Sequence, residues 1–82
     1  MKLTIESTTK IVMLKPDIFS DGVPARVWEG TSESGVKVHC FITRVAIPAE
    51  EQENAEQFMN ELHQCKPPTP EVEALPLRFF LD

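Results

Sequence analysis

The stretch that decides the fold is VPARVWEGTSESGVKVHCFITRVAI, residues 23–47, which predicts a β-hairpin. Apolar and polar residues alternate on both sides of the turn TSES, residues 31–34, as is typical of strands with one buried face. Setting Gly30 opposite Gly35 gives a register that groups the apolar residues, as a buried sheet face requires. The predicted buried pairs are Val27–Val38, Ala25–Cys40 and Val23–Ile42, and the opposite face pairs Trp28 with Lys37 and Arg26 with His39.

The segments that flank this hairpin predict further strand and a loop. Residues 41–47 place apolar side chains on both faces of the expected strand, which is typical of a central strand covered on both sides. Residues 2–14 predict a first strand, or two short strands separated near Ser7. The apolar residues of this segment that share one parity are Leu3, Ile5, Ile11 and Met13. The loop KPDIFSDG, residues 15–22, carries Ile18 and Phe19, which are apolar enough to plug an edge of the core.

A helix is expected after Pro48, over the stretch AEEQENAEQFMNELHQC, residues 49–65. Its apolar residues recur at steps of three and four, which predicts one stripe facing the core. That stripe consists of Ala55, Phe58, Met59, Leu62 and Cys65. The following KPPTP ends the helix, because prolines cannot continue it. The chain then predicts a last strand of about five residues, Leu77–Leu81.

These elements predict a single α+β domain over residues 1–82, in the order β-β-β-α-β. We expect a small antiparallel sheet of three to five strands with one amphipathic helix packed on one face. At 82 residues there is no room for a second core, and such a small domain is marginally stable, so a homodimer would add burial.

Charge is distributed very unevenly along this chain. The formal net charge is −5, from 13 acidic and 8 basic residues. Residues 49–65 hold five glutamates and no lysine or arginine, so the rest of the chain is neutral. A pI near 4.9 and scattered basic residues argue against direct nucleic-acid binding, because phosphate contacts need clustered Lys and Arg. The start MKLTIE lacks the apolar run of a signal peptide, and no segment is apolar enough to span a membrane, so we expect a cytoplasmic protein.

Two histidines and two cysteines raise the possibility of a zinc site. His39 and Cys40 are adjacent in a strand and would point to opposite faces, and His63 and Cys65 are two apart on a helix. Neither spacing is that of a structural zinc site. We therefore expect two thiols that act as small apolar residues, with no metal and no cofactor. Whether the two thiols lie close together is left open.

Catalytic signatures are scarce in this sequence. A Cys–His pair needs a base within hydrogen-bond reach of the thiol, and His39 diverges from Cys40. No nucleophile elbow or glycine-rich phosphate loop occurs, and each of the three glycines lies at an expected turn. The sequence therefore predicts a protein that is not an enzyme.

Two surfaces are candidates for binding a partner. Trp28 and Arg26 alternate on the outer sheet face, the composition of a binding patch, although Trp28 could instead cover its own sheet or lie under the loop at residues 15–22. The second candidate is the helix face opposite the apolar stripe. It consists of Glu50, Glu53, Glu56 and Glu61. This acidic face could imitate nucleic acid toward a basic groove, or it could be only a solvated surface.

The segments MKLTIESTTKIV, PARVWEGTSESGVKVHCFITRVA and PPTPEVEALPLRFFL resemble a set of short uncharacterised proteins encoded by bacteriophages and prophages. The resemblance covers most of the chain, and the loop KPDIFSDG departs from it by being longer. It implies a bacterial cytoplasmic setting and supplies no active site.

Together these features predict a small acidic, non-enzymatic protein-binding module of phage type. Its sharper form is an inhibitor of a host defence or nucleic-acid-handling machine, such as an anti-CRISPR or other anti-defence protein. Its partner would then be a basic or nucleic-acid-binding protein, with no direct contact to nucleic acid or membrane. The alternative is a small homo-oligomeric structural or assembly protein with no inhibitory role.

Overall fold

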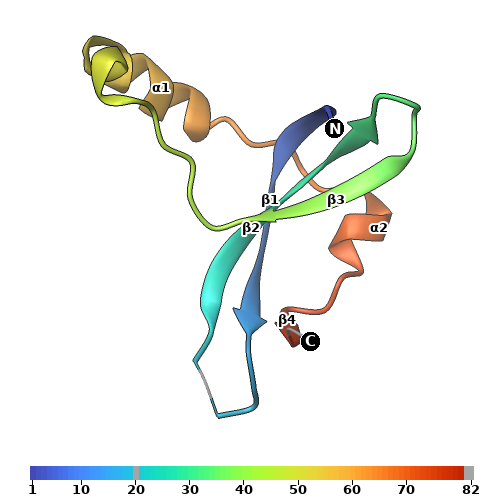
Figure 1. Cartoon of the computed structure of the whole chain (residues 1–82). Helices are drawn as coiled ribbons and strands as arrows, with labels where there is room; N and C mark the ends of the chain where they lie inside the picture. The colour runs from blue at the N-terminus through green and yellow to red at the C-terminus, as the bar shows by residue number, and fades with distance from the viewer. Residues whose placement is uncertain (20, 81–82) are drawn as a thin grey trace.

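The computed structural model describes residues 1–19 and 21–80, and it contains a four-stranded sheet with three short helical segments (Figure 1). The strands are β1 (Leu3–Lys15), β2 (Val23–Ser32), β3 (Lys37–Ile42) and β4 (Arg78–Phe80), and the helices are η1 (Ala49–Asn54, a 3₁₀-helix), α1 (Ala55–Leu62) and α2 (Pro70–Glu73). The sheet order is β3-β2-β1-β4. The α+β prediction is confirmed, with a strand number inside the predicted range. The sheet is mixed rather than antiparallel, because β4 runs parallel to β1.

The predicted hairpin forms from β2 and β3, but its register differs from the prediction by three residues. Val27 lies opposite Phe41 rather than Val38, and Trp28 lies opposite Cys40 rather than Lys37. The turn comprises residues 33–36, where Gly35 adopts a positive φ of 86° and its N–H donates to the Ser32 carbonyl at 3.0 Å. A shift by an odd number exchanges the faces of β3 relative to β2. The other predicted pairs are corrected in the same way: Ala25–Cys40, Val23–Ile42 and Arg26–His39 do not form, and Arg26 lies opposite Ile42.

β1 forms one continuous strand with an irregularity at the place where the sequence predicted a break. Its register with β2 shifts between Ser7 and Ile11. Thr8 lies inside this bulge and is fully buried. Its hydroxyl donates to the Val27 carbonyl at 2.6 Å and accepts from the Lys10 N–H at 3.2 Å. The hydroxyl thereby ties the bulge to the backbone of β2 and to the backbone of its own strand.

The core lies on the sheet face that α2 covers. Its fully buried side chains are Val12, Val27 and Val72, and Ala25 is also buried. Leu14, Phe41, Leu75 and Phe79 pack against this cluster, and the rings of Phe41 and Phe79 are 4.8 Å apart. Each fully buried valine contributes roughly 1.5–2 kcal/mol by leaving water. With so few of these, the domain has a small core.

The predicted amphipathic helix forms only as η1 followed by α1, and it does not supply the core. None of its residues is buried, and Met59 is 46% exposed. Figure 1 shows α1 standing away from the sheet on two connecting segments. The expectation that Ala55, Phe58, Met59, Leu62 and Cys65 pack into the core is therefore wrong. The reason is that the chain after α1 returns to β1, pairing Lys66 with Thr8, and α2 then occupies the buried face with Val72.

The opposite face of the sheet has no helix lying along it among the described residues. We call it the Trp28 face, after the side chains of β1, β2 and β3 that alternate away from α2. Its apolar members are Leu3, Ile5, Ile11, Met13, Trp28, Val38, Cys40 and Ile42. All of these are half-buried or exposed, with Ile11 at 47%. β3 is an edge strand that ends at Ile42, so the prediction of a central strand over residues 41–47 is wrong.

Two further predictions concern the loop and the last strand. Ile18 and Phe19 are 69% and 90% exposed, so they neither plug the core nor cover Trp28. β4 begins at Arg78 rather than Leu77, and the predicted end at Leu81 lies outside the described residues.

Candidate functional site

A hollow with many charged and hydroxyl side chains lies where α2 meets the N-terminal parts of β1 and β3 and the C-terminal part of β2. It has a volume of about 410 Å³. Its lining residues are Thr4, Glu6, Glu29, Gly30, Thr31, Lys37, His39, Lys66, Thr69, Pro70 and Glu71. We call it the Glu29 pocket, because Glu29 is its one charged residue that is buried, with 8% of its surface exposed.

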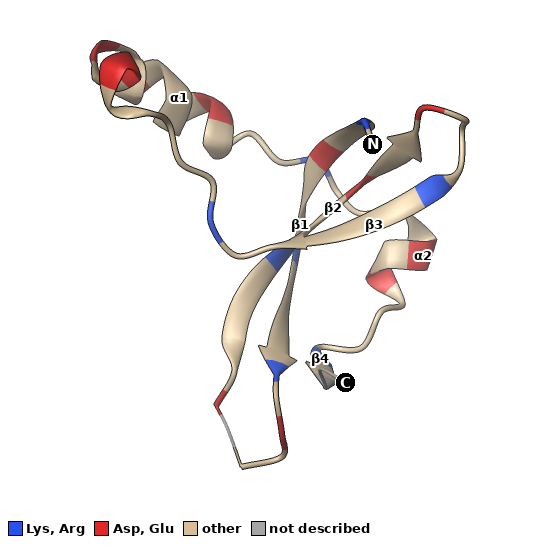
Figure 2. Ribbon diagram, viewed as in Figure 1, with Lys and Arg blue, Asp and Glu red and all other residues tan. Residues whose placement is uncertain are grey.

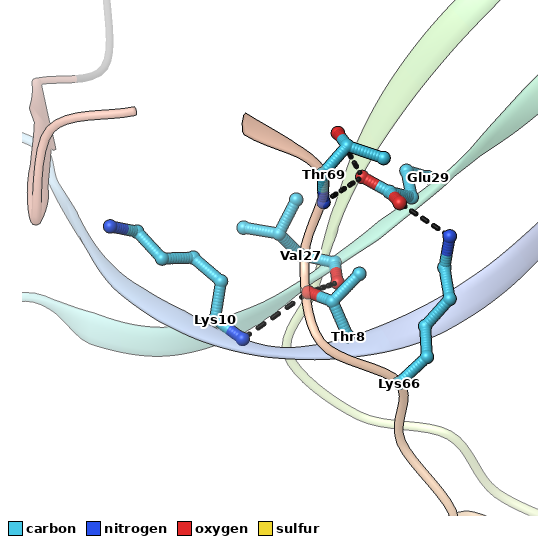
Figure 3. Close-up of polar contacts among 6 residues, drawn as sticks. All are labelled: Thr8, Lys10, Val27, Glu29, Lys66 and Thr69. Carbon is cyan, nitrogen blue, oxygen red and sulfur yellow. Dashed lines mark hydrogen bonds and ion pairs between the residues drawn. The ribbon is translucent and has the colours of Figure 1, made fainter. Parts of the chain in front are cut away.

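Strand alternation places Glu29 in this pocket. Ala25, Val27 and Glu29 occupy every second position of β2 and point toward α2, and the segment that leads into α2 passes directly over the carboxylate. Lys66 approaches one carboxylate oxygen at 2.5 Å, and the Thr69 hydroxyl donates to the other at 2.9 Å (Figure 3). The Thr69 N–H adds a longer hydrogen bond of 3.4 Å. The carboxylate therefore ties residues 66–69 to the sheet.

These contacts decide the charge of Glu29. Burial alone would raise its pKa, but the hydrogen bonds from Lys66 and Thr69 outweigh burial and hold the pKa below its ordinary value. The same hydrogen bond raises the pKa of Lys66. A carboxylate that is ionised at neutral pH and bonded through both oxygens is poorly suited to general acid or base catalysis, which needs a pKa near the working pH.

The rim of the pocket carries a second ion pair. The Lys37 ammonium lies 2.7 Å from a Glu71 carboxylate oxygen, and this joins β3 to α2. The hydrogen bond raises the pKa of Lys37 and lowers that of Glu71. Both side chains are more than half exposed, so solvent screens the pair and its contribution to stability is small.

The substitution Glu29→Gln is expected to make the free energy of unfolding depend less on pH in the acid range. The folded pKa of Glu29 is depressed, so its contribution is complete above about pH 4.5 and is lost as the pH falls through the folded value. Near neutral pH the substitution should cost about 1–2 kcal/mol, because a charge-assisted hydrogen bond becomes a neutral one. Urea unfolding at neutral pH and below pH 4 measures both effects.

The matched control is Glu33→Gln, which changes an exposed acid in the β2–β3 turn. This variant should keep the wild-type pH profile. A wild-type pH profile in Glu29→Gln would mean that the Glu29 contacts do not stabilise the fold.

Of the residues predicted to form a site, Trp28 and Arg26 do lie together on the Trp28 face. They line a shallow hollow of about 530 Å³ with Ile42, the segment 43–46, Leu62 and His63. The Arg26 guanidinium donates to the Thr8 carbonyl at 2.8 Å, so this charge is engaged with the bulge. Lys37 and His39, expected beside Trp28, lie on the other face in the Glu29 pocket because of the shifted register.

The predicted acidic residues belong to the arm that projects from the sheet, which we call the acidic arm, residues 49–62. Glu50, Glu53, Glu56 and Glu61 are all exposed, and so is Glu51. Figure 2 shows acidic colour along this arm and no basic colour within it. Some of these carboxylates make local contacts, such as Glu51 with the Asn54 amide at 2.8 Å.

The two cysteines are half-buried free thiols. Cys65 donates weakly to the Leu62 carbonyl at 3.8 Å. Cys40 lies on the Trp28 face and His39 on the opposite face, so these neighbours diverge as expected, although Cys40 is not on the predicted buried face. Among residues 1–19 and 21–80, no group of three or more His, Cys, Asp or Glu side chains is arranged to hold a metal ion.

Sequence reasoning missed Glu29, Lys66 and Thr69 as a connected group. The available signal was that Glu29 continues the two-residue repeat of Ala25 and Val27, which become buried. An acidic side chain at a strand position that faces the core needs a hydrogen-bonding or charged partner. Nothing in the sequence identified that partner as Lys66, a lysine 37 positions away.

The chain was also compared with known proteins and structures. No family model matches it, and neither the curated proteins nor the solved structures contain a significant match. Within the described residues, no helix has the length and apolar character needed to cross a membrane. Function must therefore be argued from this chain's own surfaces.

Proposed function

We propose that this protein is a non-enzymatic binding module whose acidic arm docks onto a basic surface of another protein. The observation that carries the proposal is the arm itself, with five exposed glutamates and no lysine or arginine over residues 49–62. It stands clear of the sheet, so a partner can approach it without disturbing the core (Figure 2).

The electrostatics of the arm suit recognition rather than stability. Neighbouring glutamates repel one another, and no described Lys or Arg side chain forms an ion pair with a glutamate of η1 or α1. A basic partner would relieve that repulsion and would be steered toward the arm during encounter. Because the charges are exposed, binding should weaken as salt shortens the screening length.

A narrower form of this proposal names the class of partner. Clustered carboxylates on one element can occupy a groove that normally holds phosphates, so the partner would be a nucleic-acid-handling protein. The resemblance to phage and prophage proteins supports an inhibitor of such a host machine, of anti-CRISPR or other anti-defence type, acting in the bacterial cytoplasm.

The test is affinity capture from a bacterial lysate with the triple variant Glu50→Gln, Glu53→Gln, Glu56→Gln. Wild-type protein should retain a basic nucleic-acid-binding protein at low salt, release it at high salt, and lose it to added duplex DNA. With three exposed ion pairs removed, affinity for the purified partner should fall about tenfold or more. Mass spectrometry identifies the partner and calorimetry measures the affinity.

The matched control neutralises three exposed acids outside the arm. These are Asp21, Glu33 and Glu73, changed to Asn, Gln and Gln. This control has the same net charge as the arm variant and should bind like wild type. Equal losses in the two variants would show that only net charge matters, and undiminished binding of the arm variant would refute the proposal.

A further inference from the structure

We propose that the Trp28 face is the interface of a homodimer, and that it is covered by the same face of a second copy of this chain. The inference concerns the sheet surface and does not depend on the acidic arm. Three observations support it: the excess surface of the isolated chain, the apolar composition of the face, and its lack of carboxylates.

The isolated chain exposes more surface than a compact monomer of its mass. Its accessible surface is 6281 Å², whereas a folded 9.3 kDa monomer exposes about 5,000 Å². Its radius of gyration is 14.4 Å, against about 12 Å for a compact domain of this length. The excess surface is larger than the roughly 800 Å² that each partner buries in a standard interface. The projecting arm and the Trp28 face both carry exposed apolar side chains, such as Met59 on the arm and Ile11 on the face.

The side chains of the Trp28 face are those of an interface core. Leu3 and Ile11 are 39% and 47% exposed on β1, and they share the face with half-buried Trp28, Val38 and Ile42. One face of a sheet normally packs against another layer. On this side the described chain supplies only the segment 43–46 and the end of α1, over the Trp28 end. An aromatic anchor surrounded by aliphatic residues is typical of interface centres.

Charge favours a second copy over a basic partner. The chain has 13 acidic residues, yet no Asp or Glu points to this face from the described β1, β2 and β3. The face therefore offers a basic partner no counter-charge. Two such faces related by a two-fold axis need only be apolar and of matching shape.

Sedimentation equilibrium and the fluorescence of Trp28 test this inference together. Trp28 is the only tryptophan of the chain, so its emission reports on this face alone. Wild-type protein should sediment at twice 9.3 kDa, and its emission should shift to longer wavelength when dilution separates the copies. Ile11→Glu should lower the dimer association constant at least a hundredfold while circular dichroism stays native, because Ile11 is already half exposed.

The matched control is Ile18→Glu, the same substitution at a 69% exposed isoleucine outside the face. It should leave the mass and the emission unchanged. If Ile11→Glu does not fold, Leu3→Glu at the other end of the face takes its place. A wild-type monomer at all concentrations would overturn the inference, as would a dimer that survives both face variants or one that leaves the Trp28 emission unaltered.

Discussion

Gly30→Ala is expected to destabilise the protein by about 3 kcal/mol, a large share of the stability of a domain this small. Gly30 lies opposite Ile5 in the β1–β2 ladder. A methyl group on Gly30 would overlap the Thr4 carbonyl oxygen and lie 2.8 Å from the Ile5 Cα. These are backbone atoms of the central strand pair, so relief requires the strands to separate. Thermal unfolding followed by circular dichroism should show a midpoint about 12 °C or more below wild type.

The control for this prediction is Gly35→Asn. Gly35 also needs glycine-like freedom, because its φ is +86°, but the space around it is open. Asparagine tolerates that conformation better than most residues, so the loss should stay below about 1 kcal/mol. Similar losses at the two glycines would show that backbone conformation, and not strand proximity, makes Gly30 necessary.

Val72→Asp is expected to cost about 4 kcal/mol, because an ionised carboxylate would be placed in the centre of the core. Val72 is fully buried against Val12 and Val27 although it belongs to a helix of only four residues. Urea unfolding should show a large loss of stability or no cooperative transition at all.

Met59→Asp is the informative comparison. Met59 belongs to the apolar stripe of α1 that the sequence pattern assigns to the core, yet it is 46% exposed. Its replacement should cost less than about 0.5 kcal/mol. The reverse ranking, with Met59→Asp the more damaging, would mean that α1 and not α2 closes the core.

The contrast between these two helices shows how far sequence reasoning reaches here. A three- and four-residue repeat identified α1 correctly as an amphipathic helix, because the repeat is a local property. It could not identify the surface that the helix meets, which depends on where the rest of the chain runs. α2 is a single turn with one buried residue, too short for any repeat to appear.

The hairpin shows a second limit. Its two strands were predicted from the alternation, but the turn lies at residues 33–36 rather than the predicted 31–34, and the predicted register was wrong. Register is well specified when only one face is apolar, but β3 carries Val38 and Cys40 at one parity and Phe41 at the other. β2 is also held by contacts outside the hairpin, because Gly30 pairs with Ile5 of β1 and Glu29 lies beneath Thr69. Both are contacts between distant segments, which a hairpin considered alone does not contain.

The exposure of the glutamates in the acidic arm agrees with the prediction that they face away from the core. Whether a partner binds there stays a prediction. The Glu29 pocket was missed because its groups come together only after β2 and residues 66–69 are in place. A functional surface made of neighbours in sequence can be predicted from sequence, and one made of distant residues cannot.

The parallel pairing of β4 with β1 also indicates the order in which the strands assemble during folding. Met13 and Arg78 are about 65 positions apart, whereas β2 and β3 meet across a four-residue turn at residues 33–36. Loop-closure entropy makes the first contact roughly 2.5 kcal/mol less favourable to initiate than the second. The β1–β2–β3 meander should therefore assemble first and expose its valines to solvent until α2 and β4 arrive. During that interval both faces of the sheet are bare, and a folding chain is most exposed to aggregation.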